Sequence, residues 1–194
     1  MTFYGRSISV QNQLTSRLGD LYFWIALRYD LSENVTVLRY TLFSHVPAEF
    51  EDRVGIGLKD FHYIDKWTVT DHNVAQKADL SWLNEQVVSI SQNVPERKIV
   101  IFTHHSPITW DQRAVDPAHV GSPIGSRFAS DLSEEACWKA ANARLWAFGH
   151  THYNCDFVIK DDAGKGHGKK SCVQLAGNYF KRAANFDVEK VVDV

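Results

Sequence analysis

Four histidines stand in two short segments of the chain, and their type and spacing point to metal binding. His104 and His105 are adjacent, and His150 and His152 are separated by one residue. Imidazole is the commonest metal ligand among neutral side chains, and alternate residues of an extended segment point the same way. A lone histidine is more simply a hydrogen-bonded loop residue. Four in two segments predict a site for a divalent cation.

Each pair of histidines directly follows an apolar run of strand length. Residues 98–103 form an unbroken run that is typical of a strand covered on both faces, and residues 145–148 form a second one. Gly149 would let the backbone turn sharply as it leaves the second strand. Open α/β sheets place their ligand sites outside the carboxyl ends of the strands. The two pairs are therefore expected to meet at one edge of a sheet.

Helices are predicted to flank these strands. Residues 71–92 carry apolar side chains at roughly helical spacing, with Asp71 available as a cap. A second helix is predicted over residues 132–143, because Asp131 and Glu134 have the spacing of a capping box.

Three further strands complete the pattern. Residues 35–43 are rich in β-branched and aromatic types, and residues 156–159 and 172–175 are apolar runs on either side of a Gly/Lys-rich loop, as in a long hairpin. The alternation of helices and buried strands predicts an α/β layered domain.

The two histidine segments resemble the last two metal-binding motifs of the calcineurin-like metallophosphoesterases. In that family a histidine-bearing strand end is followed by a strand that ends in Gly-His-x-His, as in residues 103–107 and 147–152 here. The resemblance is to fungal-type members and covers residues 35–158. The order, spacing and strand context of the two motifs together make it specific.

The resemblance implies a four-layer α/β/β/α fold and two bridged divalent metals that activate water to attack a phosphoester. Carried over residue by residue, His104 and His150 would bind one metal and His152 the other. His105 would either support a ligand or replace His104, if the loop register differs by one.

Three motifs that precede these two in the family are not found in working form. Residues 60–62 have the letters of Asp-x-His without a preceding buried strand, residues 19–20 begin Gly-Asp-x-x-Asp without its second acid, and residues 177–178 begin Gly-Asn-His too far downstream. We therefore expect residues 1–194 to form a single, N-terminally truncated domain, a partial four-layer sandwich that lacks the N-terminal strands.

The missing motifs also limit the metal site and the function. Without the bridging carboxylate, at most one divalent ion (Zn, Fe, Mn or similar) is expected to bind firmly. The predicted function is an incomplete metal-dependent phosphoester hydrolase. The alternatives are a non-catalytic remnant that binds at most one metal or a protein partner, and a zinc-stabilised structural module.

Composition narrows the partners and the compartment. The net charge of −2 argues against nucleic acid and anionic membranes, and no apolar stretch approaches the length of a membrane span. Three widely spaced cysteines do not form a disulfide framework, so a reducing cytoplasm is expected. A chain without the first strands should expose apolar surface and unpaired strand edges, and we expect it to self-associate.

The loop between the two motifs holds other candidates. Arg113 and Arg127 could meet a phosphate, although surface charge is the simpler interpretation. Asp111, Asp116 and His119 could line a substrate mouth, but a solvated polar loop is the simpler interpretation. A serine hydrolase is set aside because Ser106 lacks a Gly-x-Ser-x-Gly elbow.

Overall fold

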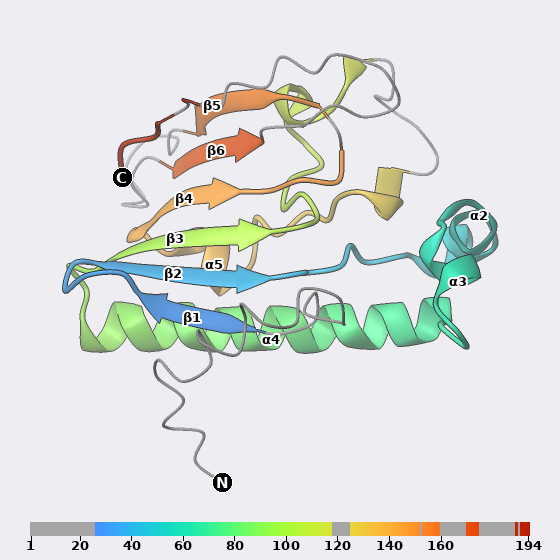
Figure 1. Cartoon of the computed structure of the whole chain (residues 1–194), viewed down its shortest axis with the longest axis horizontal. Coiled ribbons are helices and arrows are strands. Elements are labelled where there is room, and N and C mark those ends of the chain that lie inside the picture. Colours follow the sequence, from blue (N-terminus) through green and yellow to red (C-terminus); the bar gives the residue numbers. More distant parts are fainter. Residues whose placement is uncertain (1–25, 118–124, 152, 160–169, 175–188, 190) are drawn as a thin grey trace, which may run out of the picture.

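The computed structural model describes residues 26–117, 125–151, 153–159, 170–174, 189 and 191–194. The described strands form one sheet in the order β1-β2-β3-β4-β6-β5 (Figure 1). The strands are β1 (Leu27–Asp30), β2 (Val35–Tyr40), β3 (Lys98–Thr103), β4 (Ala143–Ala147), β5 (Cys155–Ile159) and β6 (Lys170–Gln174). The helices are η2 (Ala48–Phe50), α2 (Glu51–Gly57), α3 (Asp60–Tyr63), α4 (Val69–Asn93), η3 (Gln112–Ala114), η5 (Gly125–Arg127) and α5 (Ala136–Lys139).

The four inner strands, β2, β3, β4 and β6, run parallel, and the two edge strands run antiparallel to their neighbours. β3 and β4 pair in parallel, as expected if their histidines are to meet at one edge, and the predicted hairpin is confirmed as the antiparallel pair of β5 and β6. Because the inner strands are parallel, their carboxyl ends share one edge of the sheet. This mixed α/β architecture is the predicted fold class, and the described residues contain a single sheet of it.

Helix α4 covers one face of the sheet and confirms the long predicted helix (Figure 1). It begins earlier than the pattern predicted, because Thr68 is the cap and Asp71 completes a capping box with it through reciprocal contacts of 3.1 Å. The core packs α4 side chains against β2, β3 and β4, and includes Leu83, Val87, Ile90, Leu38, Ile99, Ile101 and Trp146.

The second predicted helix is much shorter than its pattern. α5 is a single turn, because the Asp131 carboxylate accepts a hydrogen bond from the Ser133 N–H at 2.9 Å and forms a local turn in place of a capping box. The predicted helix is also shorter at its carboxyl end, since β4 already begins at Ala143. The prediction of a helix over residues 132–143 is therefore wrong.

The face of the sheet opposite α4 exposes apolar side chains. One row of paired residues crosses it from Tyr29 through Val100 and Leu145 to Val158. Val100 and Leu145 are buried, with the partly buried Val192 packed against them, but Tyr29 is 46% and Val158 41% exposed. Phe102, in the adjacent row of this face, is 43% exposed.

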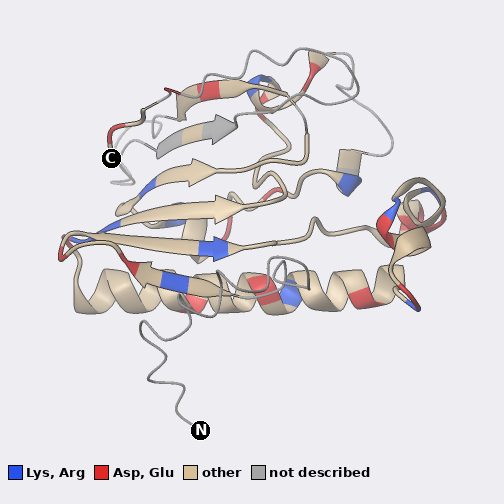
Figure 2. Ribbon diagram, viewed as in Figure 1, with Lys and Arg blue, Asp and Glu red and all other residues tan. Residues whose placement is uncertain are grey.

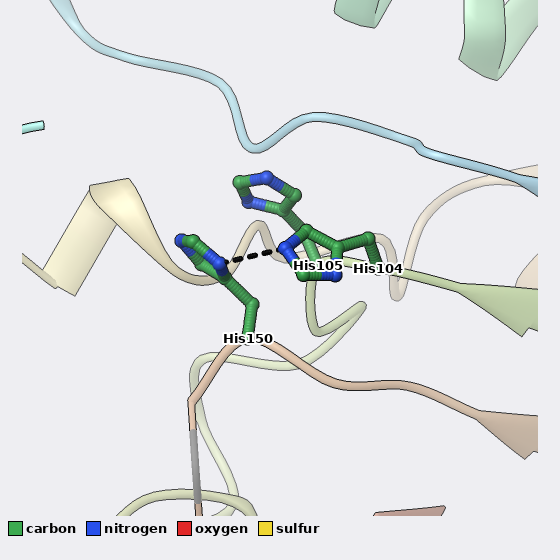
Figure 3. A group of neighbouring side chains, drawn as sticks. All are labelled: His104, His105 and His150. Carbon is green, nitrogen blue, oxygen red and sulfur yellow. Dashed lines mark hydrogen bonds between the residues drawn. The ribbon is translucent and has the colours of Figure 1, made fainter. Parts of the chain in front are cut away.

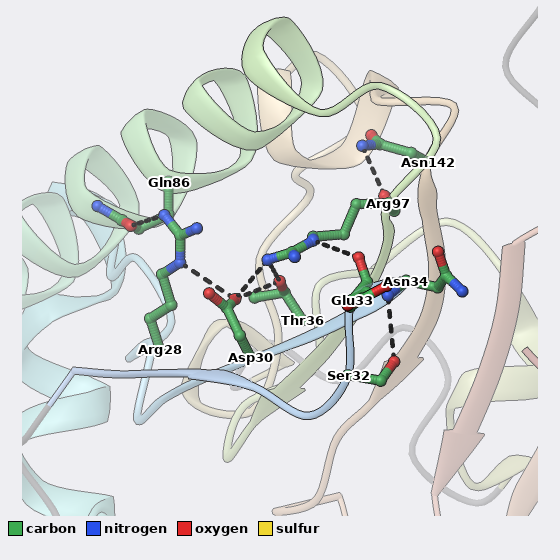
Figure 4. Close-up of polar contacts among 9 residues, drawn as sticks. All are labelled: Arg28, Asp30, Ser32, Glu33, Asn34, Thr36, Gln86, Arg97 and Asn142. Atoms are coloured by element: carbon green, nitrogen blue, oxygen red, sulfur yellow. Dashed lines mark hydrogen bonds and ion pairs between the residues drawn. The ribbon is translucent and has the colours of Figure 1, made fainter. Parts of the chain in front are cut away.

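Polar contacts fasten the edge of the sheet at the amino ends of β2 and β3. Asp30 accepts hydrogen bonds from Thr36 Oγ1 at 2.6 Å and from Arg97 at 3.0 Å (Figure 4). Asn142 donates to the Arg97 carbonyl oxygen at 3.0 Å, so β4 is tied to the same network. This end of the sheet is held by polar groups, whereas the histidines follow the opposite, carboxyl ends.

Charged residues of both signs are interspersed over the described elements (Figure 2). Strands β3 and β4 carry one charged residue each, Lys98 and Arg144, and both stand near the amino ends of their strands. The carboxyl ends of these two strands therefore carry no charged side chain of their own, and the histidines follow them. No helix in the described ranges has the length and apolar character needed to cross a membrane.

Candidate metal site

The backbone bends directly after β3, which gives two successive histidines different surroundings. Thr103 Oγ1 donates to the His105 carbonyl oxygen at 2.7 Å and accepts from the indole N–H of Trp146 at 2.9 Å. These contacts connect the bend to β4. As a result the His104 side chain is exposed, while His105 is only 2% exposed.

The chain after β4 places a third histidine in an unusual backbone conformation. His150 has a φ of 64°, in the left-handed region that few residues other than glycine adopt. Such strain clusters at functional sites, where the surrounding structure maintains it. The sharp turn predicted for Gly149 is therefore made by His150. Gly149 instead donates its N–H to the His104 carbonyl oxygen at 3.0 Å, which joins the two loops.

His104, His105 and His150 converge at the carboxyl edge of the sheet. Nε2 of His104 lies 2.9 Å from Nδ1 of His150 (Figure 3). One ligand nitrogen from each of His104, His105 and His150 lies within 4.8 Å of the other two. The predicted approach of the two segments is confirmed for these three residues. His152, the fourth predicted ligand, lies outside the described residues.

The donor set fits one divalent ion. Two nitrogens bound tetrahedrally to one zinc ion at about 2 Å lie roughly 3.3 Å apart. The pair formed by His104 and His150 is slightly closer than this, so a small opening would admit an ion between them. Imidazole donors suit zinc, iron and copper, and the described group contains no carboxylate that would favour a harder ion.

His105 is held from several sides. Its Nδ1 lies 3.1 Å from Ser44 Oγ, its ring hydrogen-bonds the backbone carbonyl of Arg127, and it stacks on the His150 ring with centroids 4.3 Å apart. Burial and the neighbouring imidazoles of His150, His104 and His72 hold the pKa of His105 well below its ordinary value. The ring is therefore neutral near pH 7 and suited to hold His150 in position.

Two residues outside the histidine motifs, Ser44 and His72, support the site. Ser44 follows the end of β2, and its carbonyl oxygen accepts a hydrogen bond from Nε2 of His72 at 2.8 Å. His72 lies in α4, is fully buried, and packs on the Phe43 ring with centroids 4.6 Å apart. Ser44 could have been found by the rule that predicted the histidines, since it too follows a buried parallel strand.

Other predicted candidates lie elsewhere or have different roles. Residues 60–62 belong to α3, where Nε2 of His62 contacts the Ile56 carbonyl oxygen at 2.9 Å. Ser106 is buried and its hydroxyl donates to the Ile108 carbonyl oxygen at 3.2 Å, so it is not activated by a histidine. His119 and the segments at residues 19–20 and 177–178 lie outside the described residues.

The comparisons with known proteins agree with this geometry. The family model described as calcineurin-like phosphoesterase matches residues 20–154, which is more than half of the chain and includes His104, His105 and His150. No curated protein matches the chain, and no solved structure matches it.

Proposed function

Because the chain belongs to the calcineurin-like phosphoesterase family, we propose that it hydrolyses phosphoesters with one divalent metal ion held by His104 and His150. The observation that carries the proposal is the 2.9 Å approach of Nε2 of His104 to Nδ1 of His150. His152 is proposed as a further ligand on the strength of its place in the Gly-His-x-His motif.

The chain's own residues would set the geometry of the reaction. The left-handed turn at His150 aims its ring at His104, and the buried His105 ring stacks against it and limits its rotation. The neutral state of His105 avoids electrostatic repulsion of a cation. A bound divalent ion would polarise a phosphoryl oxygen and lower the pKa of water.

We further propose that only one ion binds firmly, because the histidine group includes no bridging carboxylate among the described residues. We place the protein in the cytoplasm, since its three widely spaced cysteines do not have the spacing of a disulfide framework. The same donor set also supports a second candidate, a non-catalytic protein that retains a single metal.

Turnover of two classes of phosphoester separates these candidates. An aryl phosphate releases a stable leaving group, whereas an alkyl phosphate needs a proton donor for its leaving oxygen. We expect weak zinc- or manganese-dependent hydrolysis of aryl phosphates and none of alkyl phosphates, with loss of activity in His104→Ala. Metal binding without hydrolysis of either class would favour the non-catalytic candidate.

A further inference from the structure

Residues 127–130 are fixed beside the histidine site by backbone contacts. Ser106, the residue after His105, forms a parallel bridge with Ala129. Its N–H donates to the Phe128 carbonyl oxygen, and its own carbonyl accepts from the Ser130 N–H, both at 3.0 Å. The carbonyl of Arg127 contacts the His105 ring. The backbone of Arg127 is therefore anchored directly against the site.

The Arg127 side chain is also adjacent to the site. Its guanidinium carbon lies 5.2 Å from the centre of the Phe128 ring, and that ring lies 5.1 Å from the His150 ring. One phenyl ring thus contacts both the cation and the proposed metal ligand. The cation and the imidazole therefore both lie against the Phe128 ring.

The polar surroundings of Arg127 are incomplete among the described residues. Its Nε is buried and has no hydrogen-bond partner there, and no ion pair to it is found there either. Partial burial lowers the pKa of Arg127 from its ordinary value, but a guanidinium remains protonated in proteins. Burying part of a cation costs free energy unless an anion or a hydrogen-bond acceptor pairs with it.

Arg113, the other arginine that could meet a phosphate, is already occupied. Its Nε and Nη2 donate to the two carboxylate oxygens of Asp111 at 3.0 and 2.6 Å, and its guanidinium lies 4.4 Å from the centre of the Phe157 ring. The two arginines therefore differ in one respect that matters for anion binding. Arg113 has its carboxylate partner in the chain, and Arg127 has none among the described residues.

We propose that Arg127 binds a phosphoryl group beside the histidine site, so that its guanidinium completes its hydrogen bonds on a phosphate oxygen. The proposal rests on the proposed function for the identity of the anion. A guanidinium presents donors that match phosphate geometry, and it stacks on aromatic rings as Arg127 does on Phe128. Arg127 would thereby position the phosphorus atom next to His150.

A glycine leaves the space that the guanidinium occupies. A Cβ on Gly57, the last residue of α2, would collide with Nη1 of Arg127 and would lie 3.2 Å from its guanidinium carbon. Any side chain at this position must displace the cation. Gly57→Ala therefore changes the position of the Arg127 charge without removing the charge.

The test is the affinity of the zinc-loaded chain for inorganic phosphate, measured by titration calorimetry. Arg127→Gln should weaken phosphate binding about tenfold or more, because a hydrogen bond between charged groups is lost. Arg127→Lys should recover part of the loss, and Gly57→Ala should weaken binding several-fold. Arg113→Gln is the matched control and should bind phosphate like the wild-type chain. Zinc content should be the same in all of these variants.

The outcomes separate this proposal from the proposed function. Wild-type phosphate affinity in Arg127→Gln, or equal losses in Arg113→Gln and Arg127→Gln, would overturn the role of Arg127 even if phosphoesters are hydrolysed. Wild-type phosphate affinity in Gly57→Ala would contradict the placement of the Arg127 guanidinium against Gly57. Phosphate binding that depends on Arg127 in a chain without turnover would support the anion site and count against hydrolysis.

Discussion

Nε2 of His104 and Nδ1 of His150 lie 2.9 Å apart although the two residues are 46 positions apart in the sequence. The parallel pairing of β3 and β4 brings their loops together, and the hydrogen bond from Gly149 N–H to the His104 carbonyl fixes the distance between them. The candidate ligands are thus placed by the backbone before any ion binds.

The left-handed backbone at His150 leads to the first prediction, which compares two substitutions. His150→Asn and His150→Ala should both lose zinc affinity, because each removes the imidazole. The alanine variant should be less stable than the asparagine variant by about 1 kcal/mol, since asparagine tolerates a positive φ better than alanine does. Thermal or urea unfolding of the two metal-free variants measures the difference. Equal stabilities would contradict the strained turn.

Ser44 is predicted to act through His105. Ser44→Ala removes the hydroxyl that lies 3.1 Å from Nδ1 of His105 and should lower zinc affinity by about tenfold, since residues that orient a metal site typically have effects of this size. Ser130→Ala is the control. Ser130 Oγ accepts a hydrogen bond from the His45 backbone N–H at 2.7 Å, and among the described residues it makes no hydrogen bond to an imidazole. Competition with a chromogenic chelator measures both. Equal zinc affinities for the two variants would show that Ser44 does not support zinc binding through His105.

Asp79 should give a pH-dependent contribution to stability. It accepts the Leu42 N–H at 3.0 Å, where Leu42 has a φ of 47°. Burial raises the pKa of Asp79 to about 6, although the hydrogen bonds from Tyr40, Leu42 and Phe43 oppose the shift. The folded chain thus binds the proton more tightly than the unfolded chain, and stability falls as the pH rises from about 4 to about 6.

Asp79→Asn should lack this decline. The free energy of unfolding of the wild-type chain should contain a component on the order of 2 kcal/mol that is lost over that pH range, and the asparagine variant should not. Urea unfolding at pH 4 and at pH 6.5 provides the comparison. A parallel pH dependence in both proteins would show that Asp79 titrates normally.

The elements that the sequence predicted well are those with local causes. The apolar run at residues 98–103 is observed as β3 with the same bounds. The expectation that ligand sites lie beyond the carboxyl ends of the strands correctly predicted that His104 and His150 lie close together. The end of β2 at Tyr40 could not be predicted in the same way, because the turn at Leu42 depends on Asp79 of α4. Contacts between residues this far apart in the sequence leave no local pattern.

The errors have an equally physical origin. The capping-box spacing of Asp131 and Glu134 was satisfied by a side-chain turn onto the Ser133 N–H, and the start of β4 left no room for a long helix. His72 was not predicted to support the site, because Asp71 beside it explained this segment as the start of a helix. Its partner, the Ser44 carbonyl, is separated from it by 28 positions.

The apolar face opposite α4 supports the prediction that the chain self-associates. Phe102 is 43% exposed near the carboxyl end of β3 on this face, and Phe102→Lys should shift the chain toward the monomer. Ile56→Lys is the control, because Ile56 is 78% exposed on α2, away from the sheet. Sedimentation velocity of the three proteins measures the effect. A monomeric wild-type chain that unfolds cooperatively would contradict the prediction.

Metal content per chain shows directly whether the histidines hold a single ion. Elemental analysis of the purified chain, after dialysis against zinc and then against metal-free buffer, should find one ion per chain in the wild type and almost none in His104→Ala or His150→Asn. The result follows from the 2.9 Å approach of the His104 and His150 nitrogens and from the lack of a carboxylate in the histidine group among the described residues. Two firmly bound ions per chain, or retention of the ion in both variants, would contradict the account.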